Sequence, residues 1–165
     1  VQDLLDVVSK NGRLLLNFGP KPDGTRADKD VEIVHKLADW MRVNDECIHG
    51  TGLWRINQED PTKIQEGQFA DGASRNFTSE DFRFTCRGGN IYAACMACPA
   101  DGKLHIRSLR EADASHLPLW HGIVRKVEVL GNPAQVAWTR DGEALHVDLG
   151  DYQSDMPVVV KIITD

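Results

Sequence analysis

Residues 11–24 read NGRLLLNFGPKPDG, and this stretch indicates which kind of sheet the chain helps to build. Its apolar run carries one polar side chain, Asn17, near the end, and a Gly-Pro pair and an Asp-Gly pair then interrupt it. A short strand that is apolar on both faces is typical of a parallel sheet covered on each side, and Gly and Pro commonly end such a strand. We therefore predict a buried strand of the parallel type over residues 13–18.

Helical patterns flank this strand on both sides. The first ten residues place apolar side chains at helical spacing and end at Asn11 and Gly12, a pair that favours a left-handed C-terminal cap. After the strand, Thr25 and Asp28 have the spacing of a capping box, and an apolar stripe follows at helical spacing. The order helix, strand, helix over residues 1–51 predicts one unit of an α/β fold. The apolar stripe consists of Val31, Val34, Leu37, Ala38 and Met41.

The predicted strand at residues 13–18 needs partners. A strand in a parallel sheet forms hydrogen bonds along its edges, and the rest of the chain shows no second pattern of the same kind. We therefore expect the neighbouring strands upstream of Val1. The first helix also begins without an N-cap residue ahead of it, and the sequence has no initiator methionine, so we expect it to be part of a longer polypeptide.

The second part of the chain changes from helical spacing to alternation. In residues 82–87, Phe82, Phe84 and Cys86 alternate with polar side chains that include Arg83. Such alternation is typical of an antiparallel strand with one buried face and one solvated face. Seven strands are predicted in this part of the chain. They lie at Phe82–Cys86, Ile91–Ala97, Leu104–Ile106, Lys126–Leu130, Gln135–Trp138, Leu145–Leu149 and Val158–Ile163.

Turn residues separate these strands at short intervals. The Asp-Gly pairs at residues 101–102 and 141–142 suit tight hairpin turns. The number and spacing of the strands predict an antiparallel β-sandwich over residues 80–165, and residues 52–79 form a polar connection to the first region. The predicted fold class is therefore an α/β slice followed by an all-β antiparallel sandwich.

Composition places the chain among ordinary globular proteins. Of its 165 residues, 41% are hydrophobic and 27% are charged, which excludes general disorder. The formal net charge is -6 and no basic stripe is present, so we expect no nucleic-acid partner. No apolar run approaches the roughly 18 residues that a membrane-spanning helix requires, so we expect no membrane partner either.

The four cysteines raise the question of a metal or redox site. Cys95 and Cys98 have the C-x-x-C spacing, but side chains in a strand alternate between faces, so we predict that these two point to opposite sides. No second pair of cysteines or histidines completes a zinc site. We therefore interpret them, together with Cys47 and Cys86, as structural free thiols, and we predict no metal and no cofactor.

Two segments of the first region resemble a known family of enzymes. Residues 8–25, VSKNGRLLLNFGPKPDGT, and residues 37–51, LADWMRVNDECIHGT, resemble the α-L-fucosidases of glycoside hydrolase family twenty-nine. Within the second segment, Asp45 stands where the family usually has glycine, and His49 where it usually has tyrosine.

The resemblance extends into the sandwich region, where residues 79–93 and 101–109 are similar to the first strands of the family's C-terminal domain. It implies that residues 13–18 form the last strand of a catalytic β/α barrel and that the chain is the C-terminal portion of the enzyme. The complete enzyme would be a retaining, exo-acting hydrolase of terminal α-L-fucosyl linkages, with a fucosylated glycan as its substrate. Members of the family are often secreted, periplasmic or lysosomal, and the segment itself predicts no compartment.

The resemblance assigns no catalytic residue to this chain. A retaining glycosidase needs a nucleophile and an acid/base carboxylate about 5 to 5.5 Å apart. The family's nucleophile motif lies on an earlier barrel strand and no segment here matches it, so we predict that residues 1–165 alone are inactive. Asp23 is the carboxylate in the loop after the predicted strand, and in the sequence PDGT we interpret it as a turn residue.

Two residues are candidates for a role in substrate binding. The resemblance places Asn17 near the active face of the barrel, where it would orient a catalytic or sugar-binding group; the alternative is a buried asparagine that caps loop backbone. Trp120 lies between His116 and His121 and would stack on a sugar ring; the alternative is a tryptophan that closes the end of the sandwich.

Two rival interpretations remain open. The chain could be a freestanding carbohydrate-binding β-sandwich that keeps residues 1–51 as a vestige, or a structural domain without a ligand. The apolar strand at residues 13–18 favours the fucosidase interpretation, because a binding module has no use for it. A homo-oligomer is compatible with each interpretation.

The alternation also assigns faces in the later strands. His105 and His146 fall on the polar phase of their strands, so we expect both side chains to face solvent. Trp138 alternates in phase with Val136, so we expect it in the core.

Overall fold

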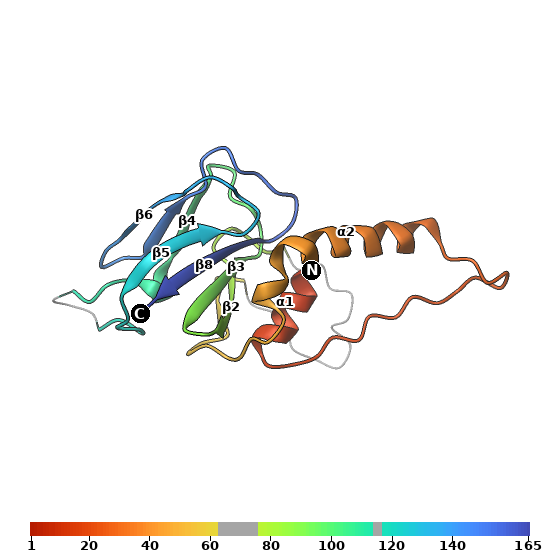
Figure 1. Ribbon diagram of the computed structural model, residues 1–165, viewed down its shortest axis with the longest axis horizontal. Coiled ribbons are helices and arrows are strands. Elements are labelled where there is room, and N and C mark those ends of the chain that lie inside the picture. Colours follow the sequence, from red (N-terminus) through yellow and green to blue (C-terminus); the bar gives the residue numbers. More distant parts are fainter. Residues whose placement is uncertain (63–75, 114–116) are drawn as a thin grey trace.

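The computed structural model describes residues 1–62, 76–113 and 117–165. Its strands form two antiparallel sheets, one of five strands in the order β1-β2-β3-β8-β5 and one of three in the order β4-β7-β6 (Figure 1). The seven predicted strands are confirmed as β2 to β8, with boundaries that shift by a residue or two, and a short strand β1 is added at the sheet edge. The strands are β1 (Gln58–Glu59), β2 (Phe82–Arg87), β3 (Asn90–Cys95), β4 (Lys103–Ile106), β5 (Val124–Val129), β6 (Ala137–Arg140), β7 (Leu145–Asp148) and β8 (Val158–Thr164).

The core of the sandwich lies between the inner faces of the two sheets, where alternate residues of each strand meet. Half-buried tryptophans also pack against this core. Burial of apolar surface, at roughly 25 cal/mol per Å² removed from water, is the main source of stability for such a core. The buried side chains include Phe82, Phe84, Ile91, Leu104, Ile106, Val127, Leu145, Val147, Val160 and Ile162.

The outer face of the five-stranded sheet is covered as well. Helix α1 (Gln2–Ser9), the end of helix α2 (Asp28–Asn44) and the 3₁₀ turn η1 (Asp45–Cys47) lie on the side of β2 and β3 (Figure 1). The indole nitrogen of Trp40 donates a hydrogen bond to the carbonyl of Pro157 at 2.8 Å. The chain therefore has three layers, which are helices, the five-stranded sheet and the three-stranded sheet. The second apolar cluster, between helices and sheet, contains Leu5, Trp40, Cys47, Phe77, Tyr92, Ala94, Met96 and Val159.

Polar contacts fix this outer layer to the sheet. The hydroxyl of Thr85 donates to the carbonyl of Cys47 at 2.8 Å. The carboxylate of Glu46 accepts hydrogen bonds from Lys161 at 2.8 Å and from the hydroxyl of Tyr92 at 3.2 Å. The domain boundaries expected near residues 51 and 79 stay predictions, and these contacts join residues on either side of them.

The sequence predicts a solvated outer face for β2, and this prediction is wrong at Arg83. Its side chain is 1% exposed, and it donates from Nε to Asp6 at 2.6 Å and from Nη1 to Asp60 at 3.0 Å. The reason is that α1, from the start of the chain, covers this face, which alternation within β2 cannot reveal. Burial by itself raises the pKa of Asp6, but hydrogen bonds from Lys10 and Arg83 outweigh it, and the net pKa is lowered.

Residues 10–27 form no helix or strand, so the strand predicted at residues 13–18 is absent from this structure. The segment extends beyond the sandwich together with the first half of α2, and Leu15 in its middle is 91% exposed (Figure 1). The physical reason is that no described strand lies beside it to share backbone hydrogen bonds. The predicted stripe of α2 is likewise uncovered at Val34, which is 44% exposed, whereas Trp40 near the helix end is buried.

Of the two helix caps predicted from the sequence, one is present in the structure and the other is not. Asn11 has a φ of 60°, and the amide of Gly12 donates a hydrogen bond to the carbonyl of Val7, which closes the predicted left-handed cap. The predicted capping box at Thr25 is wrong, because Thr25 bonds to Asp23 and Ala27 occupies the N-cap position. Neither helix in the described ranges is long and apolar enough to span a membrane.

The two Asp-Gly turns also have different outcomes. Residues 141–142 lie in the hairpin between β6 and β7, as predicted. Residues 101–102 instead connect β3 to β4, which belong to different sheets, so the hairpin predicted there is wrong. A change of sheet and a hairpin use the same turn residues, and the local sequence does not distinguish them.

All four cysteines are free thiols. Cys95 lies in the sandwich core, and Cys98 packs against the same core from beyond the end of β3, so the prediction of opposite faces is wrong. The strand ends at Cys95, and alternation does not continue past it. Burial raises the pKa of Cys47 and of Cys95 to about 12, so both thiols stay protonated and unreactive at neutral pH.

Replacement of Arg83 with methionine should destabilise the chain strongly. The substitution leaves the carboxylates of Asp6 and Asp60 without the guanidinium between them, and breaking a buried pair in this way costs about 3 to 5 kcal/mol. Urea titration should show that loss in the free energy of unfolding. The matched control, Arg125→Met, removes an exposed pair with Asp165 and should cost about 1 kcal/mol or less. Equal losses in the two variants would contradict the role given to Arg83.

Candidate functional site

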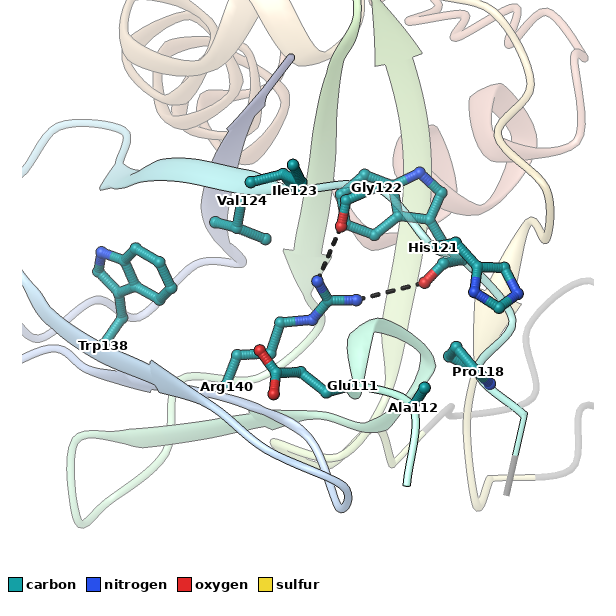
Figure 2. A pocket seen from close by; sticks show the side chains of 10 residues that line it. Glu111, Ala112, Pro118, His121, Gly122, Ile123, Val124, Trp138 and Arg140 are labelled. Atoms are coloured by element: carbon teal, nitrogen blue, oxygen red, sulfur yellow. Dashed lines mark hydrogen bonds between the residues drawn. The ribbon is translucent and has the colours of Figure 1, made fainter. Parts of the chain in front are cut away.

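A hollow of about 400 Å³ lies between strand β6 and the loop that leads into β5. Figure 2 shows Trp138 and His121 on opposite sides of this hollow, with Arg140 between them. The wall combines two indole rings with charged and polar side chains, a mixture typical of a site that binds a small polar ligand. We refer to it below as the Trp120 hollow.

Arg140 braces the wall of the Trp120 hollow. Its strand position on β6 directs the guanidinium group toward the segment between β4 and β5, where four backbone carbonyls accept its hydrogen bonds. These bonds tie the loop to the sheet and fix the shape of the hollow, and Figure 2 shows the one to Gly122. The accepting oxygens belong to Leu109 at 2.5 Å, Gly122 at 2.8 Å, Arg110 at 3.0 Å and Trp120 at 3.2 Å.

Trp120 is half-buried and packs against the sandwich core. The guanidinium carbon of Arg140 lies 5.0 Å from the centroid of its ring, within the range of a cation–π contact. A Cβ atom added to Gly122 would lie 1.9 Å from Cζ2 of the indole, so the ring rests directly on the backbone there. Trp120 thus packs against the sandwich core and lines the hollow, and both its contact with a sugar and the alternative role of closing the sandwich end stay predictions.

The chemistry available in the hollow suits binding better than hydrolysis. Among the described residues that line it, Glu111 supplies the one carboxylate, whereas a retaining glycosidase needs two about 5 to 5.5 Å apart. Burial lowers the pKa of Arg140, and the charge of Glu111 offsets part of that effect. Within the described ranges, no group of three or more histidine, cysteine or acidic side chains could hold a metal ion.

The structure does not bring Asn17 near Trp120. Asn17 is exposed on the segment that extends beyond the sandwich, whereas the loop with Trp120 lies at the other end of the molecule (Figure 1). Asp23 accepts hydrogen bonds from the hydroxyl of Thr25 at 2.7 Å and from its amide at 2.9 Å, and these bonds lower its pKa. Asp23 is therefore a turn residue, as the sequence predicts, and the role expected for Asn17 stays a prediction.

The remaining site predictions concern the histidines and one arginine. His116 lies outside the described residues. His105 is exposed and His146 half-buried on the outward face of their sheet, and Trp138 packs half-buried against the core. The sequence-based interpretation misses Arg140, although it shares the inward phase of β6 with Trp138, an unusual position for arginine that could have drawn attention to it.

Comparison with known families finds two matches along the chain. The family model described as alpha-L-fucosidase matches residues 1–46, and the model of the alpha-L-fucosidase C-terminal domain matches residues 75–162. The tissue alpha-L-fucosidase of Rattus norvegicus is 25% identical over 141 residues, which are 86% of this chain and 25% of that protein. The plasma alpha-L-fucosidase of Homo sapiens is 37% identical over 62 residues, which are 38% of this chain and 13% of that protein.

Solved structures give a similar result. The alpha-fucosidase of Thermotoga maritima is 26% identical with a TM-score of 0.69, over 98% of this chain and 33% of that chain. An alpha-L-fucosidase from Bacteroides thetaiotaomicron shares 13% identity and a TM-score of 0.65, over 99% of this chain and 31% of that chain, and supports the fold alone. These matches confirm the predicted fold class, an α/β slice followed by an antiparallel β-sandwich. The chain spans about a quarter of the length of the rat tissue enzyme, 13% of the human plasma enzyme and about a third of the Thermotoga maritima structure.

Replacement of Gly122 with alanine should displace the indole of Trp120. The new methyl group would occupy space 1.9 Å from Cζ2, so the ring must rotate away and lose its packing, at a cost of about 1 to 3 kcal/mol. In protein labelled with 5-fluorotryptophan, the ¹⁹F resonance of Trp120 should shift. Gly19→Ala is the matched control, since nothing lies within 4 Å of its added Cβ. An unchanged resonance in the Gly122 variant would contradict this placement of the ring.

Proposed function

Because the chain belongs to the alpha-L-fucosidase family, we propose that it is the C-terminal part of a retaining, exo-acting α-L-fucosidase. The complete polypeptide would hydrolyse terminal α-L-fucosyl linkages of glycans and glycoconjugates. The observation that carries this proposal is that the helical region and the sandwich each match a fucosidase model, one after the other along a single chain.

In this proposal the sandwich braces the last unit of a catalytic barrel. Its five-stranded sheet holds α1 through the pair of Arg83 and Asp6, and holds the end of α2 through Trp40. The uncovered apolar side chains at residues 14–16 and in the first half of α2 would then pack against neighbouring barrel strands and helices. Burial against such neighbours is the state that their composition favours.

The proposed packing of residues 13–18 in a barrel also suggests a role for Asn17. Once residues 13–18 pair with barrel strands, its side chain would lie near the carboxyl ends of those strands, the face where β/α barrels place their active sites. We propose that it orients a catalytic or sugar-binding group there through a hydrogen bond. Its exposure in the present structure leaves the amide accessible for that contact.

Residues 1–165 alone should show no turnover of an aryl α-L-fucoside, whereas the complete polypeptide should hydrolyse it. The reason is that the proposed mechanism needs a nucleophile and an acid/base carboxylate about 5 to 5.5 Å apart, and we place both outside this chain. Release of the aryl leaving group can be followed by absorbance. Turnover by residues 1–165 that disappears in Glu111→Gln or Asp23→Asn would overturn the proposal.

The Trp120 hollow supports a second role, which is contact with the glycan beyond the terminal fucose. Half-buried indole rings and the adjacent Glu111 and His121 offer an apolar face and polar groups side by side. The apolar C–H face of a sugar ring packs on aromatic rings, and its hydroxyls need polar partners. This role would also fit a carbohydrate-binding sandwich without catalysis.

Trp120→Ala should weaken the binding of a fucosylated oligosaccharide by roughly 3- to 10-fold, the value of one aromatic contact. Chemical-shift changes in an NMR titration of residues 1–165 measure this affinity. Leu119→Ala is the matched control, because it removes a neighbouring exposed side chain that does not line the hollow. If both variants bind as the unmodified chain does, the Trp120 hollow is not a glycan contact, and the assignment of catalysis is unaffected.

A further inference from the structure

The outward face of the three-stranded sheet carries a pair of facing histidines. His105 on β4 and His146 on β7 are register partners, and their Nδ1 atoms lie 2.7 Å apart. The rings meet edge to face, with centroids 4.9 Å apart and planes at 73°. The pair lines a second open hollow of about 360 Å³ on the sheet surface, which shares Trp138 with the Trp120 hollow. Both Nδ1 atoms therefore face each other at a surface that small solutes can reach.

A carboxylate fixes the tautomer of one of these rings. Asp141 lies 3.0 Å from Nε2 of His146 through its Oδ2 atom. Its Oδ1 atom accepts hydrogen bonds from the backbone amides of Glu143 and Ala144, so the hairpin between β6 and β7 holds the carboxylate in place. Because an anionic carboxylate accepts the Nε2 proton, Nδ1 of neutral His146 presents a lone pair toward His105.

We propose that His105 and His146 bind a divalent transition-metal ion of the kind that imidazole prefers, such as Zn²⁺, Ni²⁺ or Cu²⁺, through their two Nδ1 atoms. Imidazole nitrogens suit these ions, and the contact from Asp141 to the far nitrogen of His146 is the arrangement that usually orients a metal-binding histidine. The proposal uses residues of the sandwich alone and does not depend on the fucosidase assignment.

The distance between the two Nδ1 atoms is close to that between two ligands on one ion. With metal–nitrogen distances of about 2.0 to 2.1 Å, two nitrogens lie about 2.9 Å apart at a right angle and about 3.3 Å apart at a tetrahedral angle. The present separation of 2.7 Å must therefore open by about 0.2 to 0.6 Å. Both rings must also rotate, because their Nδ1 atoms now face each other along the hydrogen bond and must turn toward the ion.

Proton positions adjust without a net change of charge on the rings. Before binding, Nδ1–H of His105 donates to Nδ1 of His146. In the bound state His105 carries its proton on Nε2, where water accepts it, and its Nδ1 lone pair faces the ion. Water fills the remaining coordination positions, because no third histidine, cysteine or carboxylate in the described part of the chain completes the site.

Calorimetric titration of residues 1–165 with ZnCl₂ at neutral pH tests the proposal. One ion should bind per chain, and His105→Gln or His146→Gln should each abolish the heat of binding. Asp141→Asn keeps an oxygen acceptor for the hairpin amides but loses the charge, and should weaken binding by up to about 10- to 100-fold. MgCl₂ should give no heat, since Mg²⁺ prefers oxygen ligands.

The matched control is His35→Gln, an exposed histidine on α2 that should bind Zn²⁺ as the unmodified chain does. Far-UV circular dichroism of each variant verifies that the sheets are intact. The proposal is overturned if the unmodified chain takes up no Zn²⁺ at millimolar concentration. It is equally overturned if the His105 and His146 variants bind as tightly as the His35 variant.

Discussion

The guanidinium group of Arg83 connects the first helix of the chain to the sheet that carries it. It is buried between the carboxylates of Asp6 and Asp60, and the ring of Phe77 lies 5.3 Å away. A buried ion pair gives little net stability over a well-packed apolar pair, but a misaligned one is costly, because a charge is then left without a partner. The contact therefore specifies where α1 sits, while the apolar cluster around Trp40 supplies most of the attraction.

How far the sequence predicts this fold depends on what covers each face. Alternation in residues 82–87 correctly separates the inner side of β2 from the outer side, but it cannot tell that residues 1–9 bury the outer one. The run at residues 13–18 shows the opposite case. Its apolar pattern indicates a strand buried on both faces, yet no described strand lies beside it, and it stays extended and exposed.

The candidate sites also combine residues that a local sequence pattern predicts with residues that only tertiary contacts bring together. Trp120 stands out in the sequence as an aromatic residue between two histidines. The four carbonyls that Arg140 binds belong to the segment between β4 and β5, and no sequence pattern places that segment beside β6. Likewise, alternation places His105 and His146 on the outward face, but only the register of β4 with β7 sets them opposite each other. A site formed by side chains of one strand can be predicted from the sequence pattern. A site formed by side chains of two strands can be predicted only when the pairing of those strands is known.

The position of β8 in the five-stranded sheet has a consequence for synthesis of the protein on the ribosome. This strand follows all the others along the chain, yet it lies between β3 and β5 and pairs with both. Until residues 158–164 leave the exit tunnel, β5 has no neighbour in its sheet and one edge of β3 stays open. The nascent sandwich therefore exposes unpaired strand edges, which favour pairing with other chains, until β8 is available to close the sheet.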